Sequence, residues 1–276
     1  MKHFSLTACL ALSGAVLFAQ TAPSAPRGEE PAKRMAADAH PAFEVATIKP
    51  SQPGDRIRSW DTKGRYVIMR DFRVVDLIEV AYGLHLKQIA SGAEWVGTEK
   101  FDIDGIPDSD GVPNYQQLRM MFRQLLANRF GLTFHWEEKE LSAYVVTVAK
   151  GGPKMKESTA DPNEIGAFLF RGQGKLFTTN MSMPDFADRM QRSVMDKPVV
   201  DQTGLTGRYD FTLNWTPDDS QFIPMGWKTT PPSADDPAAP PNLYVALEEQ
   251  LGLKMEPVGA TVRVMVIDHI EEPSGN

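Results

Sequence analysis

The sequence predicts an α+β fold made of two similar modules, each with two helices packed on one face of a small, mainly antiparallel sheet. Some short segments alternate apolar and polar residues, as half-buried strands do, while others repeat apolar residues every three or four positions, as amphipathic helices do. The same order of hairpin, helix, strand, helix and strand pair is found twice along the chain. A chain of 276 residues, 42% of them apolar, is long enough to bury a core without disulfide bonds.

The first module is predicted over residues 43–150. Residues 43–48 alternate as a strand, and residues 56–60 and 65–69 flank a turn ending at Gly64, where glycine permits a positive φ. A helix capped by Asp71 follows this hairpin and ends at Gly83, and its apolar face is formed by Val74, Leu77, Ile78 and Ala81. The next elements are a strand at 101–103 and a helix capped by Asn114 and closed by Gly131. The module ends in a strand pair formed by 133–137 and 144–149.

The second module is predicted over residues 166–276 and repeats this order. Tyr209-Asp210-Phe211 matches Phe101-Asp102-Ile103 of the first module, a strand signature that the two share. Its elements are a hairpin of 167–170 and 175–178, a helix capped by Ser182, the strand at 209–211, a helix capped by Asn242 and closed by Gly252, and a strand pair formed by 254–256 and 262–267.

Two segments interrupt the repeat. Residues 151–165 are polar and glycine-rich, which predicts a linker between the modules. Residues 216–241 contain seven prolines and form a predicted long loop inside the second module. Phe222, Met225 and Trp227 make this loop more apolar than a plain connection, so it is either a lid or contact loop or a loop packed on its own module.

The amino terminus predicts export. Lys2 and His3 precede an apolar run at 4–19, which is typical of a signal peptide over residues 1–19. Residues 20–42, rich in Ala and Pro, predict a flexible leader. The alternatives are a membrane anchor or a lipoprotein signal around Cys9, the only cysteine, but the apolar run is short for either. We therefore expect an extracytoplasmic protein, periplasmic or secreted, with no membrane span after signal removal.

Charge and motifs exclude several function classes. The net charge of −7 argues against a nucleic-acid partner, because phosphate backbones are bound by clustered Lys and Arg. The sequence has no HExxH, nucleotide-binding glycine loop or GxSxG motif, so we predict no metal site, no cofactor and no assigned catalytic residue. The histidines expected to remain after signal removal are too scattered to predict a zinc site: His40, His85, His135 and His269.

Carboxylates leave one enzymatic alternative open. Asp201-Gln202-Thr203-Gly204 resembles the Asp-Thr-Gly loop of aspartic proteases, but the inserted Gln202 breaks that pattern and no second loop matches it. Folding could still bring acids and a histidine together for hydrolysis of a peptide or glycan. The residues considered for this alternative are Asp102, Asp201, Asp210, Asp268 and His135.

Several segments spread over the predicted modules carry a family resemblance: 43–51, 125–132, 149–154, 198–211 and 266–274. They resemble one uncharacterised secreted family, a domain of unknown function abundant in soil Acidobacteria. The resemblance implies export and a fold but no reaction. In some members of that family a similar domain follows a membrane metallopeptidase. Each half also loosely resembles the secretin and TonB short amino-terminal domain, in its element order and in Gly131-Leu132 and Gly252-Leu253.

These observations favour a non-enzymatic extracytoplasmic binding or interaction module over an enzyme. The expected partner is an envelope protein, a peptide or a glycan. Two alternatives are kept: a secreted hydrolase acting on peptide or glycan, and an accessory subunit of a sensor or secretion complex, which the domain fusion in the resembling family suggests.

Overall fold

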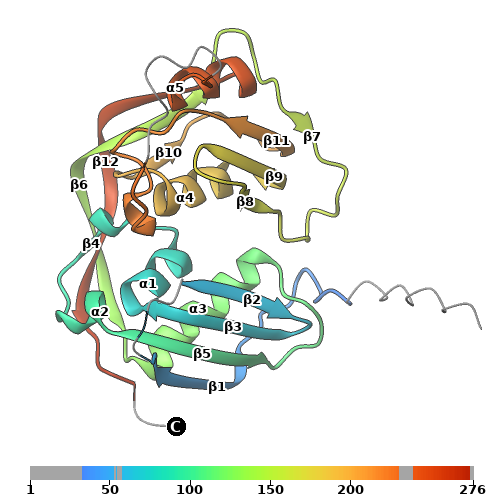
Figure 1. Ribbon diagram of the computed structural model, residues 1–276. Helices are drawn as coiled ribbons and strands as arrows, with labels where there is room; N and C mark the ends of the chain where they lie inside the picture. Colours follow the sequence, from blue (N-terminus) through green and yellow to red (C-terminus); the bar gives the residue numbers. More distant parts are fainter. Residues whose placement is uncertain (1–32, 53, 55–57, 230–238, 274–276) are drawn as a thin grey trace, which may run out of the picture. The chain divides into compact units, whose positions relative to one another are not determined.

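The computed structural model describes residues 33–52, 54, 58–229 and 239–273 (Figure 1). The predicted signal peptide at 1–19, with Cys9, lies outside the described residues, as do residues 20–32 of the predicted leader and 230–238 of the predicted loop. Among the described residues, helices pack on sheets whose strand pairs are mostly antiparallel, which confirms the α+β class. In the same residues no helix is both long and apolar enough to cross a membrane.

The first sheet belongs to the first half of the chain and has the strand order β1-β5-β3-β2, all antiparallel. Helices α1 and α3 pack against it, and the short helices η1 and α2 join α1 to β5 (Figure 1). The elements are β1 (Phe43–Pro50), β2 (Ser59–Lys63), β3 (Tyr66–Arg73), α1 (Val74–Tyr82), η1 (Leu86–Gln88), β4 (Ile89–Ala90), α2 (Trp95–Thr98), β5 (Lys100–Pro107) and α3 (Tyr115–Arg129).

The second sheet belongs to the second half and has the strand order β7-β11-β9-β8, again antiparallel. Helix α4 and the helical segment α5–η3, whose last turn is a π-helix, pack against it. The elements are β7 (Lys156–Glu157), β8 (Phe168–Phe170), β9 (Lys175–Ser182), α4 (Met183–Ser193), β10 (Val199–Asp201), β11 (Arg208–Asn214), η2 (Ile223–Met225), α5 (Leu243–Ala246) and η3 (Leu247–Leu251).

A third sheet joins the two halves. Its centre is a ribbon of β6 (Thr133–Val148) and β12 (Leu253–His269), paired antiparallel from Leu253 opposite Val148 to His269 opposite Thr133. Short parallel strands flank it, β10 beside β6 and β4 beside β12 (Figure 1). The strand pair predicted at the end of each module is therefore wrong. In each module the two predicted strands are parts of one continuous strand, and the continuous strands of the two halves pair with each other.

Long-range pairing explains why the chain does not turn within β6 or β12. No Gly or Pro interrupts 133–148, so the chain has no strong turn signal there. In β12, Pro257 and Gly259 are turn formers, yet both stay extended because they lie opposite Tyr144 and Ser142 of β6. Backbone pairing along the whole ribbon overrides the local preference of these two residues.

Each half has its own core, and both cores use the ribbon. In the first core α1 and α3 pack on β3 and β5, and Met265 and Ile267 of β12 complete it. In the second core α4 and α5–η3 pack on β9 and β11, and Tyr144 of β6 and Met255 of β12 complete it. Neither core is closed without residues from the opposite half of the sequence.

A β-bulge before the first helix recurs in both halves. In β3 the register shifts between Met69 and Phe72, and Asp71 has a φ of 62°. The carboxylate of Asp102 in β5 accepts a hydrogen bond from the Asp71 backbone N–H at 3.1 Å. The bulge turns the chain into α1, which begins after Arg73. The prediction that Asp71 caps this helix is therefore wrong, because Asp71 lies within the bulge, two residues before the N-cap.

In the second half Asn180 of β9 has the equivalent place. Its φ is 50°, and its backbone N–H donates to the carboxylate of Asp210 in β11 at 2.8 Å. Helix α4 then begins after Ser182, whose hydroxyl accepts from the Asp185 N–H as predicted. The shared motif at 101–103 and 209–211 thus serves one structural role, although the wider prediction of two similar modules stays a prediction.

Order begins earlier than the sequence predicts. Met35 is buried, and its backbone N–H donates to the carbonyl of Val112 at 3.0 Å. The side chain of Gln117 on α3 donates to the carbonyl of Ala36 at 2.7 Å. Residues 33–42, the end of the predicted leader, are therefore packed against the first half.

Gly252, which ends η3 as predicted, allows a test of how closely the end of η3 approaches the backbone at Gly152. Its φ is 66°, and a Cβ there would lie 2.0 Å from the carbonyl oxygen of Gly152. Gly252→Ala should lower the free energy of unfolding by about 3 kcal/mol, because left-handed strain adds to a backbone clash. Gly64→Ala is the control, since Gly64 has a φ of 60° but no atom within 4 Å of such a Cβ, so about 1 kcal/mol is expected. Equal losses in urea denaturation would contradict the close approach.

Candidate functional site

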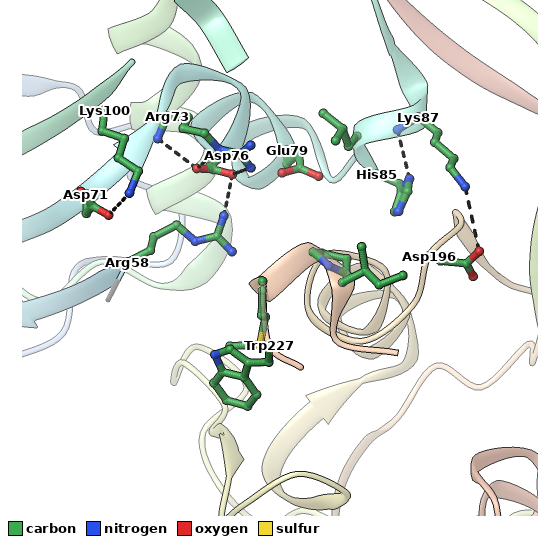
Figure 2. A pocket seen from close by; sticks show the side chains of 15 residues that line it. Arg58, Asp71, Arg73, Asp76, Glu79, His85, Lys87, Lys100, Asp196 and Trp227 are labelled. Carbon is green, nitrogen blue, oxygen red and sulfur yellow. Dashed lines mark hydrogen bonds and ion pairs between the residues drawn. The ribbon is translucent and has the colours of Figure 1, made fainter. Parts of the chain in front are cut away.

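A large pocket lies where the first half meets the loop after β11 (Figure 2). Its volume is about 720 Å³. Its polar side comes from β3, α1 and β5, its apolar side comes mainly from η2 and Trp227, and η1 contributes both Leu86 and the charged Lys87. The lining residues are Arg58, Asp71, Arg73, Asp76, Glu79, His85, Leu86, Lys87, Lys100, Asp196, Ile223, Pro224, Met225, Gly226 and Trp227.

A buried carboxylate organises the polar side. Asp76 on the first turn of α1 is 3% exposed. Arg58 donates to its Oδ1 at 2.5 Å, and Arg73 donates through Nη2 at 2.5 Å and Nε at 3.0 Å (Figure 2). Asp76 also accepts from the Arg73 backbone N–H at 2.9 Å, which satisfies one free donor at the start of the helix. Two arginines therefore share one carboxylate.

A second ion pair borders this cluster. Asp71, placed by the β3 bulge, accepts from the ammonium group of Lys100 at the start of β5. Asp71 is buried, whereas Lys100 is 46% exposed and keeps part of its ammonium group toward solvent. The pair fixes the edge of the pocket next to Asp76.

Glu79 lies one turn after Asp76 on the same face of α1 and also lines the pocket. It is 7% exposed, and no hydrogen bond joins its carboxyl group to another residue in the part of the chain described. Burial and then the negative charge of Asp76 raise the pKa of Glu79 to about 8, against the opposing effect of Arg192, Arg58 and Arg73. At neutral pH this carboxyl group is therefore protonated and can donate a hydrogen bond into the pocket.

The apolar side comes from the predicted proline-rich loop. Phe222 is fully buried, and its backbone N–H donates to the carbonyl of Val194 at the end of α4. Trp227 stacks on Phe222 with ring centroids 5.6 Å apart, while Ile223 is 58% exposed at the pocket mouth. The described part of this loop thus packs on its own half and also lines the pocket.

Next to the loop, His85 connects the two halves without being a free base. Its Nδ1 accepts from the Lys87 N–H at 3.0 Å, and it also hydrogen-bonds the backbone of Met195. Burial and then the nearby Lys87 lower the pKa of His85 to about 4, so it is neutral at pH 7. The ammonium group of Lys87 lies 4.0 Å from Asp196.

Summing these charges leaves one positive charge unmatched. The lining holds four cationic side chains, Arg58, Arg73, Lys87 and Lys100, against three aspartates, Asp71, Asp76 and Asp196. Glu79 is neutral at pH 7, so it does not offset the difference. The chain as a whole carries −7, so this pocket departs in sign from the protein that surrounds it.

The residues considered from the sequence for hydrolysis are not assembled here. Asp102 and Asp210 hold the two bulges, and Asp201 accepts from the backbone N–H of Thr203 in a turn. Asp268 and His135 do meet on the ribbon, with Oδ1 and Nδ1 2.8 Å apart, but both side chains are about half exposed. Together with Glu137 they form a surface charge cluster.

Sequence reasoning missed Asp76 and Glu79, although one signal pointed to them. Apart from these two acids, every residue of α1 is apolar, and helices apolar on all sides are buried. The acids in such a helix must be buried as well and need partners or protonation. In the described residues, no group of three His, Cys, Asp or Glu side chains is placed to hold a metal ion.

Comparison with known proteins gives a family but no described activity. A family model described as "Protein of unknown function (DUF3738)" matches residues 75–270, from α1 to the end of β12. No match was found among curated proteins or among solved structures.

The pKa of Glu79 predicts how stability depends on pH. The folded protein keeps a proton that the unfolded chain releases between its ordinary pKa of 4.5 and about 8. This group therefore stabilises the fold fully below about pH 4.5, and its contribution is lost as the pH rises to 8. Glu79→Gln should remove this dependence and stabilise the protein at pH 8 by roughly 2–4 kcal/mol. Urea denaturation at pH 5 and pH 8 measures it. Glu94→Gln, at an exposed site, is the control, and an unchanged slope in Glu79→Gln would contradict the burial of Glu79.

Proposed function

The chain belongs to the DUF3738 family of proteins of unknown function, and from its pocket we propose that it is an exported binding protein for a small organic anion with an apolar part. The observation that carries the proposal is the unmatched positive charge beside Asp76, in a pocket whose opposite side is apolar. A ligand that supplies one negative charge and buries apolar surface balances both features.

The polar side offers donors to such an anion. Arg58 uses Nη1 for Asp76, is 30% exposed and lines the pocket, so its guanidinium group can also donate to a ligand. The protonated Glu79 adds an O–H donor, and the ammonium group of Lys100 lies at the edge. A carboxylate, sulfonate or phosphate group accepts hydrogen bonds from all three kinds of donor.

The apolar side and the pocket volume limit the rest of the ligand. Leu86 and Ile223 are both large, apolar and exposed at the rim, and Trp227 also lines the pocket (Figure 2). Exposed apolar residues that gather around a pocket mark a binding surface. A volume of about 720 Å³ is within the usual range for sites that hold drug-sized molecules. The acidic end of a peptide or glycan, or the acidic group of an amphiphile, has this chemistry.

Export is the second part of the proposal and rests on the sequence before residue 33. The basic start and apolar run at 4–19 support a cleaved signal and a periplasmic or secreted protein. Fusing residues 1–42 to a reporter that is active only outside the cytoplasm tests this. Cleavage near residues 19–22 and an active reporter are expected, and an inactive, uncleaved cytoplasmic fusion would overturn it.

A hydrolase is the second candidate, and Glu79 is the observation that favours it. A protonated carboxyl group in a pocket, with a pKa near neutrality, suits a general acid, and Asp76 beside it is held by two arginines. A panel of nitrophenyl glycosides and chromogenic peptides tests this class. Turnover that Glu79→Gln abolishes while binding is kept would favour the enzyme over the binding protein.

The wider resemblances add proposals about partners. Each half resembles the secretin and TonB short domain, and a similar domain follows a membrane metallopeptidase in some members of the family that the sequence resembles. Both resemblances support an accessory role beside an envelope protein. Such a partner is compatible with a ligand-binding pocket, because a sensor or secretion subunit can report on a bound molecule. Co-purification with a membrane protein in the presence of ligand would support this role.

Binding of 8-anilinonaphthalene-1-sulfonate, a probe with one sulfonate and an apolar body, tests the pocket. Ile223→Ser should weaken binding about fivefold, since removing part of a buried aliphatic contact costs about 1 kcal/mol. Because Ile223 is 58% exposed, folding should be little affected. Leu169→Ser, also exposed but outside the pocket, is the matched control and should bind as the wild type does. Equal fluorescence titrations for both variants would overturn the site.

A further inference from the structure

A second, smaller cavity lies at the contact between α3 and α4. Its volume is about 140 Å³, and most of its lining residues are polar or charged. Residues 114–116 at the start of α3 form one side, and the chain before β8 with parts of β9, α4 and β11 forms the other. The side chains that matter for binding are those of Asn180, Asp185, Arg189 and Arg208.

Arg189 is the unusual member of this lining. Its guanidinium group lies over the ring of Tyr115, 4.6 Å from the centroid, and 5.8 Å from that of Phe168. The Nε atom is buried and has no hydrogen-bond acceptor. Among the described residues, no carboxylate lies within ion-pair distance of Arg189, and burial lowers its pKa. A buried guanidinium N–H without an acceptor is costly, and an anion in the cavity would supply that acceptor.

The neighbouring charges do not supply that anion. Asp185 lies one turn before Arg189 on α4, but its Oδ2 is 3.9 Å from Arg208. Glu164 forms an ion pair with Arg34, and the next acid along α4, Asp188, binds Arg192 at 2.7 Å. After these pairs are counted, Arg189 is the positive charge left over in the cavity.

Asn180 contributes an unused acceptor. Its Nδ2 donates to the carbonyls of Asp161 at 2.7 Å and Glu164 at 3.0 Å, which fixes the orientation of the amide. The Oδ1 atom is consequently turned away from these carbonyls, and it is buried without a donor. The cavity therefore combines a surplus donor with a surplus acceptor, and a ligand that satisfies both must carry a negative charge and a hydrogen to donate.

The smaller cavity is lined from the same positions along its half of the chain as the larger pocket is from the other half. Asp71 at the β3 bulge lines the larger pocket, and Asn180 at the β9 bulge lines the smaller one. The third residues of the two helices, Asp76 and Asp185, line them too, as do Lys100 and Arg208, the first residues of β5 and β11. Corresponding positions in the two halves thus border two separate cavities.

We propose that this cavity is a binding site for a small protonated oxyanion of the hydrogen phosphate type, held by the guanidinium groups of Arg189 and Arg208 and the amide of Asn180. The anion supplies acceptors to Arg189, and its hydroxyl group donates to the Asn180 Oδ1 atom. Since the lining comes from both α3 and α4, the bound ion links the two halves and stabilises their contact. The proposal is independent of the function proposed for the larger pocket.

Thermal unfolding of the full chain in inorganic phosphate, against sodium chloride of equal ionic strength, tests the site. Phosphate at about ten times its Kd should raise the Tm by about 3 °C or more. Arg189→Met, which keeps an unbranched apolar chain beside Tyr115 and Phe168, should lose this shift yet be at least as stable as the wild type without phosphate. Arg171→Met is the matched control, because Arg171 also lies over a ring, that of Phe177, but outside the cavity.

Three results would overturn the proposal. One is the absence of a phosphate shift beyond that of chloride, and another is an equal shift in Arg189→Met and the wild type. The third is equal stabilisation by sulfate and phosphate. Sulfate has no proton to donate to Asn180 at neutral pH, so it should stabilise the protein less than phosphate does. Equal effects would show that Asn180 does not bind the ion as proposed. If Arg189→Met does not fold, calorimetric titration of Arg189→Gln with phosphate gives the same comparison.

Discussion

Pairing of β6 with β12 is the constraint on which the rest of the structure depends. Each strand leaves the last helix of its own half, and each then completes a core that belongs partly to the other half. Hydrogen bonds along the ribbon set one register, so Met265 and Ile267 face the first core and Met255 faces the second. The halves are therefore held at a defined contact, with the larger pocket between α1, η1 and η2 and the smaller cavity between α3 and α4.

Charge is buried at this contact to an unusual degree. Arg192 of α4 donates to Asp188 and to the hydroxyl group of Tyr115 on α3, and all of these side chains are largely removed from solvent. Such a network contributes little net stability, but breaking it leaves uncompensated charges, so it fixes one arrangement of the helices. Arg192 also limits the pKa rise of Glu79, so the network that orders the contact also affects the larger pocket.

The bulges explain why polar groups collect at these places. At both bulges a residue with positive φ is held by an aspartate of the neighbouring strand, and the chain then turns directly into a helix. The bulge residue and the third helical residue consequently border one cavity. In the first half these are Asp71 and Asp76, and in the second half they are Asn180 and Asp185. A local backbone feature thus places charged groups where the two halves meet.

The sequence by itself determined what depends on near neighbours. The helix starts at Asn114, Ser182 and Asn242 follow from caps that bond two or three residues on, and the α+β class follows from alternation and helical spacing. Only the tertiary structure decided the β6–β12 pairing, because ribbon contacts join residues far apart and override the turn preference at Pro257 and Gly259. The candidate sites have the same origin. Glu79 keeps its proton, and Arg189 lacks an acceptor, only because distant segments enclose them.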